Sequence, residues 1–115
     1  MIGGQGFGIR VAHVWSSVDG VNWIRTNTNT AFKPSANQSC EVFDGKMWRI
    51  GGVTDDEGRN NEAWSSTDGV NWTRETSTPN FSGRVSHSTT VYDNKIWLMG
   101  GFDGEAKNDV WVVAE

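Results

Sequence analysis

The chain has 115 residues, the size of one ordinary domain, with a formal net charge of −4, 36% hydrophobic residues and seven tryptophans. This aromatic content excludes a disordered chain, and the acidic balance argues against a nucleic-acid binder, which needs a basic surface. No apolar run is long enough to span a membrane, the first residues have no signal-peptide pattern, and the single cysteine, Cys40, provides neither an internal disulfide nor a cysteine-based zinc site.

Strand-like patterns begin early in the chain and recur at a fixed spacing. The first two are expected at 12–16 and 21–26. The segment that joins them, Trp15–Trp23 (WSSVDGVNW), returns 49 residues later as Trp64–Trp72 (WSSTDGVNW), with eight of nine positions identical. The start of the chain, MIGG, matches RIGG at 49–52. An internal repeat of this length is typical of propellers and solenoids.

A second block repeats further along the chain with the same period. Asp44–Gly52 (DGKMWRIGG) returns as Asp93–Gly101 (DNKIWLMGG), again 49 residues on. Val, Ile, Trp and Thr in these segments suit pleated, half-buried strands. We therefore expect four strands in each period, which adds strands at 37–43, 46–50, 62–66, 70–76, 86–92, 95–99 and 109–113.

Short polar turns separate these strands. Asp19-Gly20 and Asp68-Gly69 lie between two strand patterns, and Asp44-Gly45 and Asp93-Asn94 lie between two others. Such pairs tolerate positive φ at both positions, which predicts type I′ hairpins. Two of the apolar strands end in a glycine pair, where backbones approach closely; these pairs are Gly51-Gly52 and Gly100-Gly101.

The ordered set of apolar strand, Gly-Gly, variable loop and Trp-bearing strand resembles the kelch family of β-propeller repeats, which run to about 50 residues and form four-stranded blades. Arg84 and His87, which lead into the next apolar-Gly-Gly strand, belong to the same pattern. The resemblance implies an all-β fold of antiparallel blades, about 2.4 per chain. A single repeat region then holds a partial blade at 1–27, a full blade at 36–76 and a partial blade at 83–115.

The turn from Ser17 to Trp23 is also similar to the Asp-box of sialidases and other propellers, although it has one residue fewer between Asp and Gly. The Asp-box is a structural hairpin, so we assign it no catalytic role. The tryptophans recur in equivalent positions, which favours blade packing over stacking on sugars. They are Trp15, Trp23, Trp48, Trp64, Trp72, Trp97 and Trp111.

Functional residues are expected on the longer loops, since variable loops on a rigid scaffold carry most binding sites. Strand direction alternates within a blade, which places the loops at 5–11, 53–60 and 102–107 on one face, together with those at 27–36 and 77–83. The binding residues that we assign to this face are Asp55, Asp56, Arg59, Arg84, His87 and Lys107.

The chemistry of these loops favours binding over catalysis. Asp55-Asp56-Glu57 lacks the alternating spacing of a calcium loop, so we expect a solvated acidic loop with no metal or cofactor. A histidine-based triad would depend on His13 or His87, and the copper ligands of galactose oxidase, another kelch propeller, have no counterpart. We expect a non-enzymatic scaffold that binds a protein or a glycan. The alternatives are a fragment of a galactose-oxidase-like or sialic-acid-epimerase-like enzyme, and a designed or evolutionary-model fragment.

An array of about 2.4 blades leaves an apolar face open at each end, because propellers close with about four to eight blades. Exposed apolar faces of this size predict association. We therefore expect either a piece of a longer protein or several copies in one ring. A trimer is preferred, since three copies supply about seven blades. Neither nucleic acid nor membrane is expected as a partner, and the cellular compartment stays open.

Overall fold

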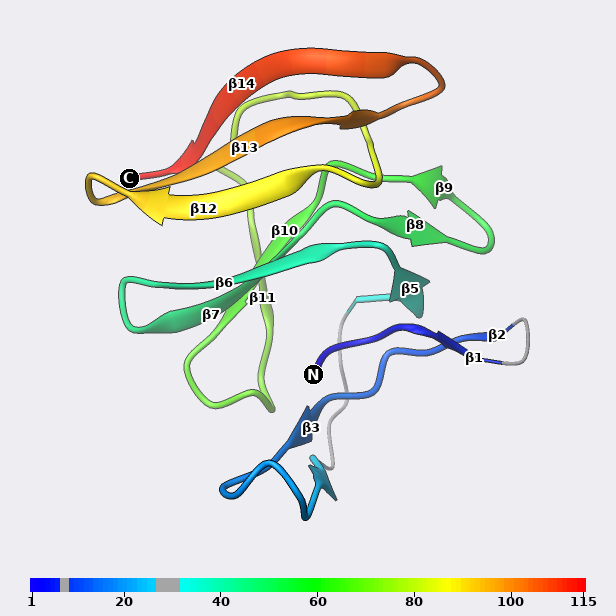
Figure 1. Cartoon of the computed structure of the whole chain (residues 1–115), viewed down its shortest axis with the longest axis vertical. Helices are drawn as coiled ribbons and strands as arrows, with labels where there is room; N and C mark the ends of the chain where they lie inside the picture. The colour runs from blue at the N-terminus through cyan, green and yellow to red at the C-terminus, as the bar shows by residue number, and fades with distance from the viewer. Residues whose placement is uncertain (7–8, 27–31) are drawn as a thin grey trace.

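Figure 1 shows the structure, a computed structural model that describes residues 1–6, 9–26 and 32–115. The regular elements in these ranges are β-strands, and their pairings are antiparallel. Among the described residues, no helix is long and apolar enough to cross a membrane. The fold is therefore all-β, as predicted, with successive sheets that follow one another as blades (Figure 1).

The central sheet is a complete four-stranded blade, which we call blade 2. Its strands are β6 (Ser39–Phe43), β7 (Lys46–Ile50), β10 (Ala63–Ser66) and β11 (Thr73–Glu75), in the spatial order β11-β10-β7-β6. All four lie within their predicted ranges. Their order along the chain is their order across the sheet, so alternate side chains of each strand reach the two neighbouring blades.

Blade 3, the last sheet of the chain, has three strands. They are β12 (Ser88–Tyr92), β13 (Lys95–Phe102) and β14 (Ala106–Ala114), in that order. β13 continues through Gly100-Gly101, with an irregular register after Met99. The prediction that the strand ends at the glycine pair is right for β7 and wrong for β13, because a bulge lets β13 keep its pairing with β14.

Blade 1, the described part of residues 1–26, is the least regular. β3 (Trp15–Ser16) pairs with β4 (Ile24–Arg25), and Ile2 forms an isolated bridge with Val14. Both strands are shorter than the sequence predicts. The end of the predicted partial blade, residue 27, lies outside the described residues.

The loops expected between the second and third strands contain hairpins. β1 (Gln5–Gly6) pairs with β2 (Ile9–Arg10), and β8 (Val53–Thr54) pairs with both β9 (Gly58–Arg59) and β5 (Ser35–Ala36). In Figure 1 these hairpins and the β13–β14 turn lie at one side, opposite the β6–β7 and β12–β13 turns. We call this side the loop face. Of the predicted loops, residues 7–8 and 27–31 lie outside the described residues.

Two of the four predicted type I′ turns are present. Asp44-Gly45 has φ of 52° and 69°, and Asp93-Asn94 has φ of 51° and 56°. The prediction is wrong for Asp19-Gly20 and Asp68-Gly69, where only the glycine has positive φ. In each of these turns the carboxylate accepts hydrogen bonds at 2.8 Å from two following backbone N–H groups, which folds a wider turn. These bonds hold the pKa of both aspartates well below its usual range.

The hydrophobic core lies between the blades. The junction of blades 2 and 3 buries eight apolar side chains from the two sheets and their connection: Phe43, Trp48, Ile50, Ala63, Phe81, Ile96, Leu98 and Val113. The junction of blades 1 and 2 is smaller and buries Val14, Phe32 and Trp72, with Ile2, Met47 and Trp64 packed against them. Burial at about 25 cal/mol per Å² of apolar surface makes these junctions the main source of stability.

Each junction also repeats one set of polar contacts. Gln38 Nε2 donates to Ile2 O at 2.6 Å across the first junction, and His87 Nε2 lies 3.0 Å from Ile50 O across the second. Gln38 and His87 are 49 residues apart, so one position of the repeat reaches back to the previous blade. A Cβ on Gly51 would lie 2.7 Å from the His87 ring, which explains a glycine there.

Candidate functional site: the loop face

Charged side chains join neighbouring hairpins on the loop face. Arg10 of β2 forms an ion pair with Asp55, in the next hairpin. Lys33 Nζ lies 2.9 Å from Asp56 Oδ2 and 2.7 Å from Glu57 Oε1, and it lowers the pKa of Asp56. All three carboxylates of the acidic loop are therefore paired with cations of the protein. Such exposed pairs are screened by solvent and add little to stability, so their main effect is to orient the hairpins.

Arg59 makes the corresponding contact one repeat later. It is the counterpart of Arg10, 49 residues on, and its guanidinium lies 5.2 Å from the ring centroid of Phe102 in blade 3. A cation over a ring face is attracted by the negative face of the π-system. The arginine at this position thus joins each hairpin to the next, first through an ion pair and then through an aromatic ring.

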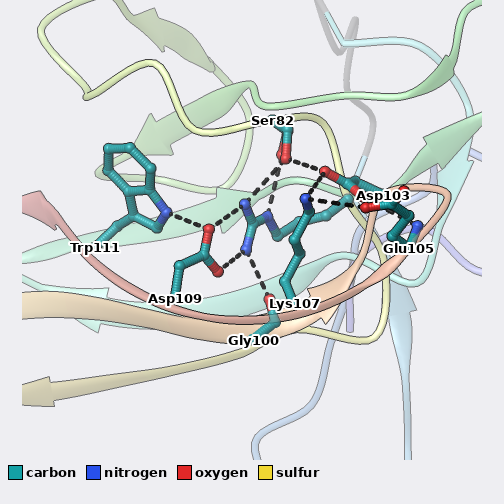
Figure 2. A network of polar contacts seen from close by, with 8 residues as sticks. Ser82, Gly100, Asp103, Glu105, Lys107, Asp109 and Trp111 are labelled. Carbon is teal, nitrogen blue, oxygen red and sulfur yellow. Dashed lines mark hydrogen bonds and ion pairs between the residues drawn. The ribbon is translucent and has the colours of Figure 1, made fainter.

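Arg84 is buried and bonds to Ser82, Gly100 and Asp109, which Figure 2 labels as members of one polar network. Its guanidinium binds Asp109 through both terminal nitrogens, at 2.5 and 2.9 Å, and Nη1 also donates to Gly100 O at 2.9 Å. Trp111 Nε1 donates to the same carboxylate at 2.9 Å. The Arg84 bonds, followed by the Trp111 bond, hold the pKa of Asp109 well below its usual range. This bidentate geometry orders the end of blade 3 and leaves Arg84 buried.

Lys107 belongs to the edge of the same network. Its Nζ lies 3.2 Å from Asp103 Oδ2, and Ser82 Oγ donates to that oxygen at 2.6 Å (Figure 2). The Ser82 bond is the larger cause that lowers the pKa of Asp103 to about 2. Because Ser82 also accepts from Arg84 Nη2 at 3.1 Å, the network runs from the buried arginine to the loop surface.

His87 lies at the junction of blades 2 and 3, apart from the other five candidates. Its Nε2 is 2.9 Å from Ser39 Oγ as well as 3.0 Å from Ile50 O. Burial, together with the nearby positive charge of Arg84, lowers the His87 pKa. The structure therefore brings Arg84 and Lys107 into one network and places Asp55, Asp56 and Arg59 in hairpin contacts.

A second buried arginine was not among the predicted residues. Arg49 of β7 donates to Ser35 Oγ, and its guanidinium lies 4.8 Å from the centroid of Phe32. Arg84 lies 5.7 Å over Phe81, the counterpart of Phe32 one repeat later. Both junctions thus have a guanidinium over an equivalent ring. The two arginines occupy different positions of the repeat, so a comparison of the repeats does not point to Arg49.

The described residues also form a polar groove beside blade 2. Its volume is about 470 Å³, and it lies between β9, residues 60–62, β11 and the connection to blade 3. Arg59 is the one predicted binding residue that lines it. The other polar lining residues, which sequence reasoning missed, include Asn60, Asn61, Glu62, Arg74 and Asn80. These residues could have been found from the run Asn60-Asn61-Glu62, which ends two residues before the repeated Trp64.

The groove residues are partly held by one another. Asn61 Nδ2 donates to Phe81 O at 2.9 Å and to Asn80 Oδ1 at 3.2 Å. Glu62 accepts from Trp64 Nε1 at 2.9 Å, while Arg74 lies 3.8 Å from Glu62 and is half-exposed. The groove therefore offers fixed amide and carboxylate groups and one loosely held guanidinium.

The comparisons with known proteins bear on the fold. Residues 1–113 match the family model described as DUF6242 beta propeller domain. The curated proteins contain no match to the chain. Within residues 1–6, 9–26 and 32–115, no three His, Cys, Asp or Glu side chains are grouped so that they could hold a metal ion.

Proposed function

This chain belongs to the DUF6242 beta propeller family, and we propose that it is a non-enzymatic, kelch-like propeller unit whose loop face binds a glycan. The observation that carries the proposal is the polar groove beside blade 2. The kelch-like assignment is supported by the repeated Gly-Gly and Trp positions and by the polar residue that links each blade to the previous one.

The groove suits a ligand rich in hydroxyl groups. A sugar hydroxyl both donates and accepts hydrogen bonds, and the groove presents donors and acceptors side by side. Asn61 and Asn80 provide amides, Glu62 provides a carboxylate, and Arg74 provides a guanidinium. A volume of about 470 Å³ lies within the usual range of small-ligand sites.

The contacts of the candidate reactive groups support a non-enzymatic role. Arg84 and Asp109 bind each other with bidentate geometry, and His87 bonds to Ser39 and to a backbone carbonyl. Arg84 and Asp109 therefore use their polar atoms on each other, and His87 uses Nε2 on the protein, while its Nδ1 is buried without a hydrogen-bond partner. An enzyme would need such groups to be directed at a substrate within hydrogen-bond reach.

A glycan array with the wild-type chain and two arginine variants tests the proposal. Arg74→Ala removes the half-exposed guanidinium of the groove and is expected to weaken glycan binding at least ~10-fold, the value of one charge-assisted hydrogen bond. Arg25→Ala is the matched control, since Arg25 is the counterpart of Arg74 in blade 1 and lies outside the groove. Equal binding by wild type and both variants, or no binding by wild type, contradicts the proposal.

A further inference from the structure

We propose that the groove beside blade 2 selects an acidic sugar and binds its carboxylate through the guanidinium groups of Arg59 and Arg74. This inference rests on the proposed glycan binding and names the class of sugar that the groove takes, a uronic acid. The residues that line the groove lie between 57 and 83, in the complete blade and in the connection that follows it.

Arg74 of β11 keeps hydrogen-bond donors that a ligand can use. Its side chain is 54% exposed, and its Nη2 lies 3.8 Å from Glu62 Oε1, which is too far for a hydrogen bond. Glu62 uses its other oxygen, Oε2, to accept from Trp64 Nε1 at 2.9 Å. Arg74 is therefore attracted by Glu62 without being bonded to it, and its planar guanidinium can bind a carboxylate that enters the groove.

Arg59 of β9 provides the second guanidinium of the groove. It is exposed, and no carboxylate in the described part of the chain forms an ion pair with it. Its contact is the ring of Phe102, whose centroid lies 5.2 Å from the guanidinium carbon. A ring face attracts the cation but is not a partner for the N–H groups in the guanidinium plane. Phe102 therefore orients Arg59 and leaves these donors for a ligand.

A third guanidinium lies in the same blade as Arg74. Arg49 of β7 and Arg74 of β11 are both directly opposite Trp64 of β10, one on each side, so the three side chains form a row on one face of blade 2. Arg49 is 1% exposed, and its Nε and Nη1 have no hydrogen-bond partner among the described residues. Burial lowers the pKa of Arg49, and the negative charge of Glu62 opposes that shift. Both arginines of the row therefore act on the one carboxylate of Glu62.

The balance of charge at the groove is positive. The two carboxylates that line it belong to Glu57 and Glu62. Glu57 Oε1 is 2.7 Å from the ammonium group of Lys33, which lies outside the groove, so its charge is already compensated there. Glu62 is then left with the guanidiniums of Arg49, Arg59 and Arg74. Because a charge taken out of water is costly without a partner, an anionic group on the ligand is favoured over a neutral one.

The equivalent position of blade 3 shows the same carboxylate with its charge balanced. Asp109 is the counterpart of Glu62, 47 residues on, and each accepts a hydrogen bond at 2.9 Å from the tryptophan two residues later. Asp109 also binds Arg84 through both terminal nitrogens, so one carboxylate meets one guanidinium. In blade 2 no such bidentate pair forms, and the guanidinium of Arg74 can make it with the carboxylate of a sugar.

A glycan array with matched acidic and neutral sugars tests this selectivity. The probes are galacturonic acid and glucuronic acid oligosaccharides, each beside the galactose or glucose oligosaccharide of the same length and linkage, with a sulfated galactose oligosaccharide as a further arm. Wild type is expected to bind a uronic acid probe at least ~10-fold more tightly than its neutral partner and than the sulfated probe. Since added salt screens exposed charges, the preference over the neutral partner is expected to shrink as the NaCl concentration rises.

Glutamine variants assign the preference to the groove. Arg59→Gln and Arg74→Gln each remove one positive charge and are expected to lower the ratio of acidic to neutral affinity at least ~3-fold. Arg25→Gln, outside the groove, is expected to keep the wild-type ratio. Far-ultraviolet circular dichroism checks that each variant keeps the β-fold.

The possible failures are distinguishable. Equal binding of acidic and neutral probes, a preference for the sulfated probe, or a wild-type ratio in both groove variants overturns this inference and leaves glycan binding in place. A wild-type chain that binds neither acidic nor neutral probes overturns the proposed function together with the inference.

Discussion

Trp48 in blade 2 and Trp97 in blade 3 occupy the same position of the repeat and make the same hydrogen bond. Trp48 Nε1 donates to Phe43 O at 3.1 Å, and Trp97 Nε1 donates to Tyr92 O at 3.0 Å. Yet Trp48 is buried and Trp97 is partly exposed, since blade 3 covers one and no described blade covers the other. The burial of this tryptophan therefore depends on the neighbouring blade rather than on the local sequence. Single substitutions can separate the contribution of burial from that of the hydrogen bond.

The largest expected difference is between Trp48→Ala and Trp97→Ala. Both variants lose one hydrogen bond, but Trp48→Ala also leaves a cavity in the core and is expected to lower the free energy of unfolding by about 3–5 kcal/mol. Trp97→Ala is expected to cost about 1 kcal/mol. Urea unfolding at pH 7 measures the loss in each variant. Equal losses would mean that the Trp97 side chain is covered as well as the Trp48 side chain.

The second prediction compares two arginines that contact blade 3. Arg84→Ala removes a buried side chain together with its hydrogen bonds to Ser82, Gly100 and Asp109, and it is expected to lower the free energy of unfolding by about 3 kcal/mol. Arg59→Ala removes a surface contact with Phe102 and is expected to cost about 0.5–1 kcal/mol. Urea unfolding at pH 7 measures both values. A loss below ~1 kcal/mol for Arg84→Ala would show that Asp109 is well solvated without it.

The strands were predictable because each depends on local sequence. β7 forms at its predicted residues, and Asp44-Gly45 and Asp93-Asn94 form the predicted turns, since positive φ is a property of those residue pairs. Asp19 and Asp68 behave differently, because their carboxylates bond to backbone N–H groups further along the chain. A two-residue turn motif does not show whether the aspartate side chain will bond to the backbone in this way.

The candidate site was less predictable because its residues find partners across blades. Arg84 binds Asp109, 25 residues away, whereas the counterpart of Arg84 in blade 2 is Ser35. A comparison of repeats therefore contained no matching Arg–acid pair. The groove was missed for a related reason, since Asn61 and Asn80 come together only when the connection between blades 2 and 3 folds back onto β10.

A third prediction concerns the first glycine of each Gly-Gly pair. Gly51 and Gly100 have φ of +67° and +63°, so alanine at either position costs about 1–2 kcal/mol of backbone strain. Gly51→Ala also places a Cβ 2.7 Å from the His87 ring, whereas the nearest atom to a Cβ on Gly100 is 3.3 Å away. We expect Gly51→Ala to lower the free energy of unfolding by about 1 kcal/mol more than Gly100→Ala. Thermal melts of both variants measure the difference, and equal melting points would contradict the close approach of His87.

The smallest expected effect is the pH dependence that His87 adds to the junction of blades 2 and 3. Burial lowers its pKa in the folded chain, so below about pH 6.5, the usual value for an unfolded histidine, the unfolded state binds more protons. Stability is therefore complete above about pH 6.5 and falls as the pH decreases toward the folded pKa. The Ile50 carbonyl opposes this pKa shift in part, because it accepts a hydrogen bond from Nε2 of the protonated ring.

His87→Gln removes this dependence without removing the contact. Glutamine is the residue at the equivalent position, where Gln38 Nε2 donates to Ile2 O at 2.6 Å, so the variant is expected to keep its stability at pH 7.5 within about 1 kcal/mol. Urea midpoints between pH 7.5 and 5 are expected to fall for wild type and for the control His13→Gln, and to stay nearly constant for His87→Gln. Glutamine does not titrate, so an equal fall of the urea midpoint with pH in all three proteins would assign the pH dependence to other groups. His87 would then be a packing residue only.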